Sequence, residues 1–379
     1  TVSRRIARDS PSRGARVSAS RTVTQQRRAS GVSVAATCRF PRTRLVAVAV
    51  VMMLAVAAVE PSLERASASA AGQADSAPDV RTAAGIATPP DFKVAFLADT
   101  DDESGQRQVL GLINREGANL VLHQGDFSYD RGPTDDWVNE IDDILGRNFP
   151  YLGSDGNHDN WRRYIPFFRD RLSRMGLDPD DLPSRSRGNY STIYQGLKLV
   201  FTMEGGDSDF IEEQLANDDH IWKICSWHQG RRATNVGPKG DEVSASSYTA
   251  CFDAGAIVAQ GHSHTYSRSK TISDFETLTV DATCPDDPGT PETDVCVSPG
   301  SSFFFDSSLG GKDSRRLENT ERDYWASYYA GEFGALFIEF NVDGDAAKAR
   351  GYFKTADGAV HDRFIITAVA AASGRAGSG

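Results

Sequence analysis

Short apolar runs alternate with amphipathic segments along the chain after residue 90. The apolar runs predict buried strands, which fall at residues 93–98, 120–123, 150–152, 198–203, 223–227 and 256–259. Apolar side chains at helical spacing predict helices between them, at residues 105–118, 137–146, 210–216 and part of 246–254. Three later segments, residues 335–342, 349–354 and 363–366, are predicted as antiparallel strands. Strands that alternate with helices indicate an α/β fold, in which ligands bind at the carboxyl ends of strands.

The first 90 residues have a different sequence pattern. Arg39, Arg42 and Arg44 precede an unbroken apolar run of 15 residues at 45–59, and small residues follow around position 70. This order is typical of a secretory signal peptide, and the alternative is an uncleaved single-span anchor. We therefore expect an amino-terminal extension and signal peptide at residues 1–70, a linker at 71–90, one domain at 91–368 and a disordered tail at 369–379. The expected location is outside the cytoplasm, either secreted or periplasmic.

Charge is distributed unevenly. Residues 1–70 hold 12 basic and 3 acidic side chains, which leaves 29 basic and 49 acidic side chains in the remainder, a net charge of about −20. A surface this acidic repels a phosphate backbone, so nucleic acid is not an expected partner. We also expect no membrane contact after signal cleavage. The composition, 39% hydrophobic and 25% charged, is ordinary for a globular protein.

Four of the five cysteines lie in the predicted domain. Cys284 and Cys296 flank a loop rich in Pro and Asp, and in an oxidising compartment they would form a loop-closing disulfide. Cys225 and Cys251 are either a second pair or two buried thiols. No CxxC pair is present, so a structural zinc ribbon is not expected.

Polar motifs follow directly after several predicted strands. They are Asp99, then GDFSY at residues 125–129, GNHD at 156–159, His228, and GHSH at 261–264. Carboxylate, amide, phenol and imidazole groups suit iron, zinc or manganese. Each motif alone fits ordinary turn chemistry, but together they predict a metal site at the carboxyl edge of a sheet.

These motifs, in this order, resemble those of the calcineurin-like metallophosphoesterases. Tyr129, three residues after Asp126, and the run GHSHTYSR make the chain most similar to the purple acid phosphatase branch. The resemblance covers about residues 91–366. It implies a single catalytic domain built as a four-layer α/β/β/α sandwich.

The resemblance also implies a site for two metal ions. Carried over position by position, the first metal, Fe(III) in the purple enzymes, would bind Asp99, Asp126, Tyr129 and His264. The second, Fe(II), Zn or Mn, would bind Asn157, His228 and His262, with Asp126 as the bridge. His158 would be the catalytic residue that stabilises or protonates the leaving group.

Three further residues have competing interpretations. Asp101 stands where many family members have His, and it is predicted to be solvated or to accept a hydrogen bond near the site, with metal ligation as the alternative. Arg315 and Arg316, which follow the Gly310-Gly311-Lys312 loop, are candidates for binding the substrate. A solvated charged loop is the competing interpretation.

The expected function is hydrolysis of a small phosphomonoester by metal-bound hydroxide, in the manner of an acid phosphatase. A phosphodiesterase or nucleotide phosphoesterase of the same superfamily is the first alternative, because both would use the same ligands. A secreted metal-binding protein without catalysis is the second.

Overall fold

The computed structural model describes residues 87–369, except 102–103, 131, 183–187 and 285–293. All of these residues belong to one compact unit within residues 77–379. The expected signal peptide, most of the expected linker and residues 370–379 lie outside the described residues. No helix in the described part of the chain has the length and apolar character needed to cross a membrane.

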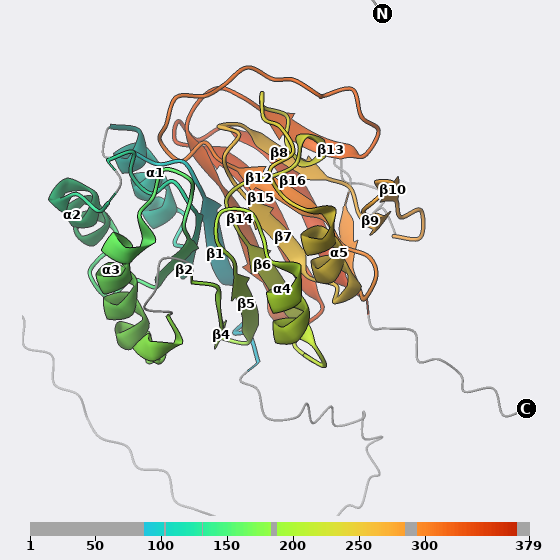
Figure 1. Ribbon diagram of the computed structural model, residues 1–379, viewed down its shortest axis with the longest axis horizontal. Coiled ribbons are helices and arrows are strands. Elements are labelled where there is room, and N and C mark those ends of the chain that lie inside the picture. Colours follow the sequence, from blue (N-terminus) through green and yellow to red (C-terminus); the bar gives the residue numbers. More distant parts are fainter. Residues whose placement is uncertain (1–86, 102–103, 131, 183–187, 285–293, 370–379) are drawn as a thin grey trace, which may run out of the picture. The chain divides into compact units, whose positions relative to one another are not determined.

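Two seven-stranded sheets form the centre of this unit (Figure 1). The first sheet has, in order, β11 (Val295–Val297), β16 (Val360–Ala368), β15 (Lys348–Thr355), β14 (Gly334–Phe340), β1 (Phe92–Leu97), β2 (Leu120–Gln124) and β3 (Tyr151–Ser154). The second has β13 (Trp325–Tyr329), β8 (Tyr266–Ser269), β12 (Phe304–Ser307), β7 (Ile257–Gln260), β6 (Trp222–Ser226), β5 (Leu197–Phe201) and β4 (Tyr190–Tyr194). A small ribbon pairs β9 (Ile272–Asp274) with β10 (Thr279–Val280).

The strands that lead to the polar motifs are parallel to one another within each sheet, and β11 also pairs with β16 in parallel at the far edge of the first sheet. In the first sheet β1, β2 and β3 are parallel, and in the second β5, β6, β7 and β12 are parallel. The first sheet continues from β14 through β15 to β16 with antiparallel pairs. Because parallel neighbours end at one edge, the loops after β1, β2, β3, β6 and β7 can converge on one site.

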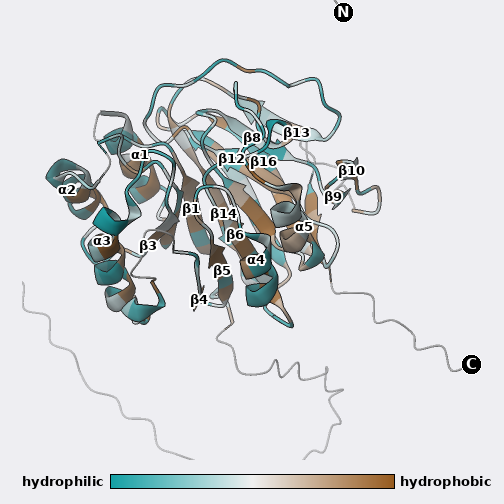
Figure 2. Ribbon diagram, viewed as in Figure 1, coloured by the Kyte–Doolittle hydropathy of each residue, from teal (hydrophilic) through white to brown (hydrophobic). Residues whose placement is uncertain are grey.

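The two sheets pack face to face through large aromatic side chains. Phe96 of β1 meets Phe305 of β12 with ring centres 5.0 Å apart, and Trp222 of β6 meets Phe340 of β14 at 5.1 Å. Their buried apolar faces form one cluster that extends under the helices of the first sheet. Figure 2 shows this interior as the hydrophobic region of the strands.

Helices cover the outer faces of both sheets. α1 (Ser104–Arg115), α2 (Asp135–Ile144) and α3 (Trp161–Arg174) lie on the side of the first sheet, and α4 (Ser208–Leu215) and α5 (Ala245–Asp253) cover the second (Figure 1). Short 3-10 turns lie at Pro179–Asp181, Arg232–Thr234 and Val342–Gly344. The α/β/β/α sandwich implied by the resemblance is thereby confirmed, with the predicted strands and helices present to within a few residues.

Both pairs of described cysteines form disulfides. Cys284 is bonded to Cys296, as expected for the loop that they flank. Cys225 of β6 is bonded to Cys251 of α5, so the sequence alternative of two buried thiols is not realised. The second bond attaches a covering helix to a central strand of its sheet.

Candidate metal centre

Loops that follow parallel strands bring the predicted ligands together. Asp99 comes two residues after β1, Asp126 two after β2, His228 two after β6 and His262 two after β7. All four side chains are buried, and Asp99 and His228 are fully inaccessible. Segments more than 160 residues apart in sequence therefore meet at one edge of the sandwich.

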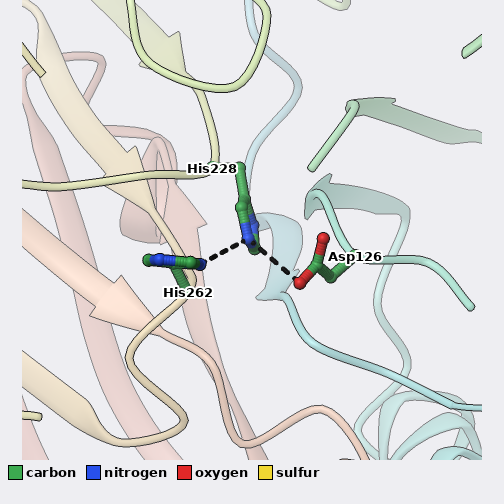
Figure 3. Close-up of side chains that lie close together, drawn as sticks. All are labelled: Asp126, His228 and His262. Carbon is green, nitrogen blue, oxygen red and sulfur yellow. Dashed lines mark hydrogen bonds and ion pairs between the residues drawn. The ribbon is translucent and has the colours of Figure 1, made fainter. Parts of the chain in front are cut away.

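Three of these residues form what we call the histidine group: Asp126, His228 and His262. Asp126 Oδ2 lies 3.2 Å from His228 Nε2, and His262 Nδ1 lies 3.0 Å from the same nitrogen. One donor atom from each residue falls within 4.8 Å of the others (Figure 3). A carboxylate and two imidazoles at this spacing match the ligands of transition-metal sites.

A second set, the tyrosine group, contains Asp99, Tyr129 and His264. The Tyr129 hydroxyl donates to Asp99 Oδ1 over 3.2 Å and lies 3.1 Å from His264 Nε2, which is itself 3.2 Å from Asp99 Oδ1. Asp99 joins the two groups, because its Oδ2 accepts the backbone N–H of His262 over 2.7 Å. The structure thus contains two adjoining triads of metal-binding atoms.

The outer nitrogen of each imidazole is already engaged. His228 Nδ1 lies 2.7 Å from the carbonyl of Gln124, and His264 Nδ1 lies 2.9 Å from the carbonyl of Asp313. A carbonyl can only accept, so each Nδ1 carries a proton and Nε2 is the nitrogen that faces the group. His262 Nε2 similarly faces the Glu242 carboxylate at 3.1 Å. This arrangement fits metal ligands, since lone pairs aimed at carboxylates need a cation or a proton between them.

The backbone at these positions adopts an unusual conformation. Asp99, Asp126, His262 and His264 all have positive φ, between 53° and 79°. Such residues cost about 1–3 kcal/mol each and cluster at functional sites. The loop at Gly156 adds a steric requirement, because a Cβ there would overlap the Asp126 carboxylate. The fold therefore accepts strain to aim these side chains inward.

Comparison with known proteins agrees with this geometry. Residues 92–266 match the family model described as calcineurin-like phosphoesterase. The chain contains a calcineurin-like phosphoesterase domain. The match begins at β1 and ends just after the GHSH loop, so it includes every strand end that carries a member of the two groups.

Solved structures are similar to the chain at low sequence identity. A purple acid phosphatase from yellow lupin (Lupinus luteus) seeds is similar with a TM-score of 0.56 and 16% identity, covering 74% of this chain and 55% of the lupin chain. The chain thus spans little more than half of the lupin protein's length. PhoD is similar with a TM-score of 0.47 and 12% identity, covering 75% of this chain and 71% of that one. No curated protein sequence matches the chain.

In the site of the phosphoesterase domain, the charge of each ionisable side chain shifts the pKa of its neighbours. Burial opposes ionisation of Asp99, but the imidazoles of His264, His228 and His262 outweigh it and lower the pKa of this carboxyl. Burial also opposes protonation of His228, yet Asp126 and Asp99 raise its pKa to about 10. The carboxylates thus hold a proton on His228, at the position where a bound cation would lie.

The pKa values of His262 and Tyr129 shift in the directions that keep both side chains neutral. Burial and the neighbouring His228 lower the pKa of His262 to about 2. Burial, followed by the charges of Asp99 and Asp126, raises the pKa of Tyr129 far above its ordinary value. A phenolate at Tyr129 therefore requires a strong compensating cation beside it.

The remaining predicted residues lie at the edge of the site. Asn157 is exposed, and its side chain makes no hydrogen bond with a described residue. His158 is exposed too, with its ring centre 4.6 Å from that of Tyr129 and its backbone N–H donated to Asp126 Oδ1 over 2.9 Å. Both belong to the loop after β3, so they border the tyrosine and histidine groups from one side.

The two candidate arginines lie in different surroundings. Arg315 is half-buried, donates its backbone N–H to the carbonyl of His264 over 3.0 Å, and opposes the rise in the Tyr129 pKa. Arg316 has a side chain that is 80% exposed and forms an ion pair with Glu318. Only Arg315 adjoins the two groups.

Asp101 is buried rather than solvated. Its side chain is 10% exposed and forms an ion pair with Lys312, whose ammonium also lies 4.4 Å from the centre of the Tyr129 ring. Of the alternatives from sequence, a hydrogen-bonded position beside the site fits best. A carboxylate neutralised by Lys312 adds little net charge to the tyrosine group.

Three residues that contact the site did not emerge from the sequence as functional. Asp159 accepts the backbone N–H groups of Phe127 and Gly156, at 3.0 Å and 2.8 Å, and so fixes the GNHD loop against the Asp126 loop. Glu242 and Lys239 both reach His262, the latter with Nζ 2.8 Å from Nε2. The sequence could have indicated Asp159, because it is the last residue of the GNHD motif. The loop that carries Lys239 and Glu242 has no motif.

Proposed function

We propose that this protein is an exported two-metal phosphoesterase that hydrolyses small phosphomonoesters. The observation that carries the proposal is the pair of adjoining triads, each with an imidazole Nε2 directed inward by an outer hydrogen bond at Nδ1. Asp99, Tyr129 and His264 would hold one ion, and Asp126, His228 and His262 the other, with Asn157 close to the second. We propose Fe(III) for the first position and Fe(II), Zn or Mn for the second.

Metal ions at such a pair of sites lower the pKa of a bound water molecule and draw charge from the phosphoryl oxygens. The chain supplies the other requirements. Lys239, half-buried beside His262, and Arg315, beside His264, place two cations where a phosphate dianion would approach. His158 lies exposed over the groups, within reach of solvent, and would give a proton to the departing alkoxide.

Export is proposed on two supports. The basic and apolar order of residues 39–59 is that of a signal peptide. Two disulfides in a domain of this size fit an oxidising compartment outside the cytoplasm.

The deciding experiment compares an aryl phosphate monoester with the matching diester, using protein loaded with metal and a chelated control. We expect faster monoester cleavage that is lost on chelation and restored by metal. Faster diester cleavage would replace the monoesterase assignment with a phosphodiesterase. Metal binding without cleavage of either ester would contradict the enzyme assignment.

A further inference from the structure

A cavity of about 340 Å³ lies beside the candidate metal centre. The residues that line it are mostly polar: Asp155, Asn189, Glu204, Asp207 and Gln229, together with Met203, Gly205 and Gly206. Asp155 and Glu204 also line a second hollow of about 480 Å³ that includes Asn157 and His158. The two hollows therefore share a wall, formed by Asp155 and Glu204, on the side of the site where a leaving group would pass His158.

Asp155 is the unusual member of this wall. Its side chain is 95% buried, and its sole hydrogen bond with a described residue is a 3.5 Å contact from the backbone N–H of Glu204. A contact of that length is at the outer limit of hydrogen bonding. Burying a carboxylate without a strong donor or a cation is costly. The second oxygen, Oδ2, has no partner among the described residues, and the residue borders the cavity.

The rest of the lining offers acceptors and no cation. No Lys, Arg or His is among the described residues that line the 340 Å³ cavity. Asn189 uses its amide group within the wall, donating to Asp207 and accepting from Met203. Glu204 is exposed, and Asp207 caps α4. A ligand that enters the cavity thus meets the carboxyl groups of Asp155, Glu204 and Asp207, and no cationic side chain among the described lining residues.

We propose that this cavity binds the leaving group of the substrate and that this group is an alcohol bearing an ammonium. The inference rests on the proposed function, since it treats the metal centre as the phosphoryl site and His158 as the boundary between phosphate and leaving group. An ammonium supplies the donor that Asp155 lacks, and charge-assisted hydrogen bonds of this kind are strong. A leaving group with a second phosphate would face two carboxylates and be rejected.

Isosteric pairs of substrates test the charge alone. The pairs are 2-aminoethyl phosphate with propyl phosphate, and 4-aminobutyl phosphate with pentyl phosphate, measured on metal-loaded protein. We expect kcat/KM to favour the amino ester of at least one pair by roughly tenfold or more, the scale of a hydrogen bond to a charged group. Asp155→Asn should remove most of that preference, and Glu204→Gln, at an exposed position, should remove less. Asp209→Asn, which removes an exposed carboxylate from α4 outside the cavity, should leave the preference unchanged.

The experiment distinguishes failure of the ammonium subsite from failure of the proposed function. Hydrolysis of an aryl phosphate together with equal rates within both pairs would overturn the ammonium subsite and leave the phosphoesterase intact. If no ester is hydrolysed, saturation-transfer NMR with 4-aminobutan-1-ol against pentan-1-ol decides. Selective binding of the amine that Asp155→Asn abolishes would support the subsite, and equal or absent binding would overturn it.

Discussion

The tyrosine group and the histidine group share one sheet edge but differ in chemistry. The first combines a carboxylate with a phenol whose pKa burial and Asp99 raise, while Lys312 and Arg315 lie beside it. The second combines a carboxylate with two imidazoles, and one of these is contacted by both Glu242 and Lys239. With metals bound as proposed, the first group would need the more strongly charged cation to release its phenol proton, whereas the second would suit a divalent ion.

Strain is shared between the groups. Each contains one carboxylate and one histidine with positive φ. The loop at residues 261–265 contributes His262 to one group and His264 to the other, so the distance between the groups is set by three consecutive residues. A difference in metal preference must therefore come from the donors and their neighbours. The four predictions below test this comparison.

The largest effect is expected from His228→Ala, at the centre of the histidine group. His228 Nε2 contacts both other members, so its loss should release the metal of that group and lower kcat by about 10³-fold or more. Metal analysis should show one ion lost and the other retained. His220→Ala, at a half-buried histidine paired with Asp218, is the matched control and should keep both. Full activity in His228→Ala would mean that this histidine is not a ligand.

Tyr129→Phe probes the tyrosine group. If the phenolate binds Fe(III), charge transfer from phenolate to iron should colour the protein, and the variant should lose that visible band. We expect activity to fall by roughly tenfold, because the variant removes one donor and keeps Asp99 and His264 in place. Tyr328→Phe, at an exposed tyrosine on β13, is the control. A variant that keeps its colour would show that another residue binds the iron.

A smaller effect is expected from Lys239→Met, beside the histidine group. Burial, and then the charge of Arg315, lower the pKa of this ammonium, which shows how near the two cations lie. Without Lys239 a phosphate dianion loses one charged contact, so KM should rise by roughly tenfold with a smaller change in kcat. Lys348→Met, at an exposed position of β15, should leave KM unchanged. A large fall in kcat with unchanged KM would instead indicate that Lys239 acts in the chemical step.

The parallel strands and their motif residues could be predicted because their signals are local. The run at residues 93–98 differs by one residue from β1, and the polar residues after it follow directly in sequence. The fold, the tyrosine group and the histidine group all depend on such apolar runs and on the polar residues that follow them. Asp99, Asp126, His228 and His262 were thus named without knowledge of the contacts between them.

The residues that were missed depend on distant contacts. β8 has the sequence YSRS, and its Arg268 is buried because Asp362 of β16, 94 residues away, forms an ion pair with it at 2.7 Å. No apolar pattern indicates such a strand. Lys239 and Glu242 lie in a loop of Gly, Pro and charged residues, which reads as solvated until its path past His262 is known. Sequence therefore predicts the candidate ligands more readily than the residues that surround them.

The smallest predicted effect concerns the support behind both groups. Asp306 of β12 is fully buried, and Ser308 donates a hydrogen bond to it. Ser308 also contacts Ser263 Oγ at 3.1 Å and the carbonyl of Thr265, on the loop that carries His262 and His264. Burial, and more weakly the charge of Asp99, raise the pKa of Asp306 well above its ordinary value of 3.8. The folded protein thus holds a proton on this carboxyl that the unfolded chain releases.

The sign of the resulting pH dependence follows from that difference. The contribution of Asp306 to stability is greatest below pH 3.8 and falls as the pH rises above it, by up to about 1.4 kcal/mol per pH unit. Asp306→Asn keeps an acceptor for Ser308 and cannot ionise, so urea unfolding should show a smaller decline in stability between pH 4 and pH 7 than in the unmodified protein. Asp209→Asn should leave the decline unchanged. An equal decline in Asp306→Asn would show that Asp306 ionises without cost, and the loop shared by the two groups would then rest on a charged support.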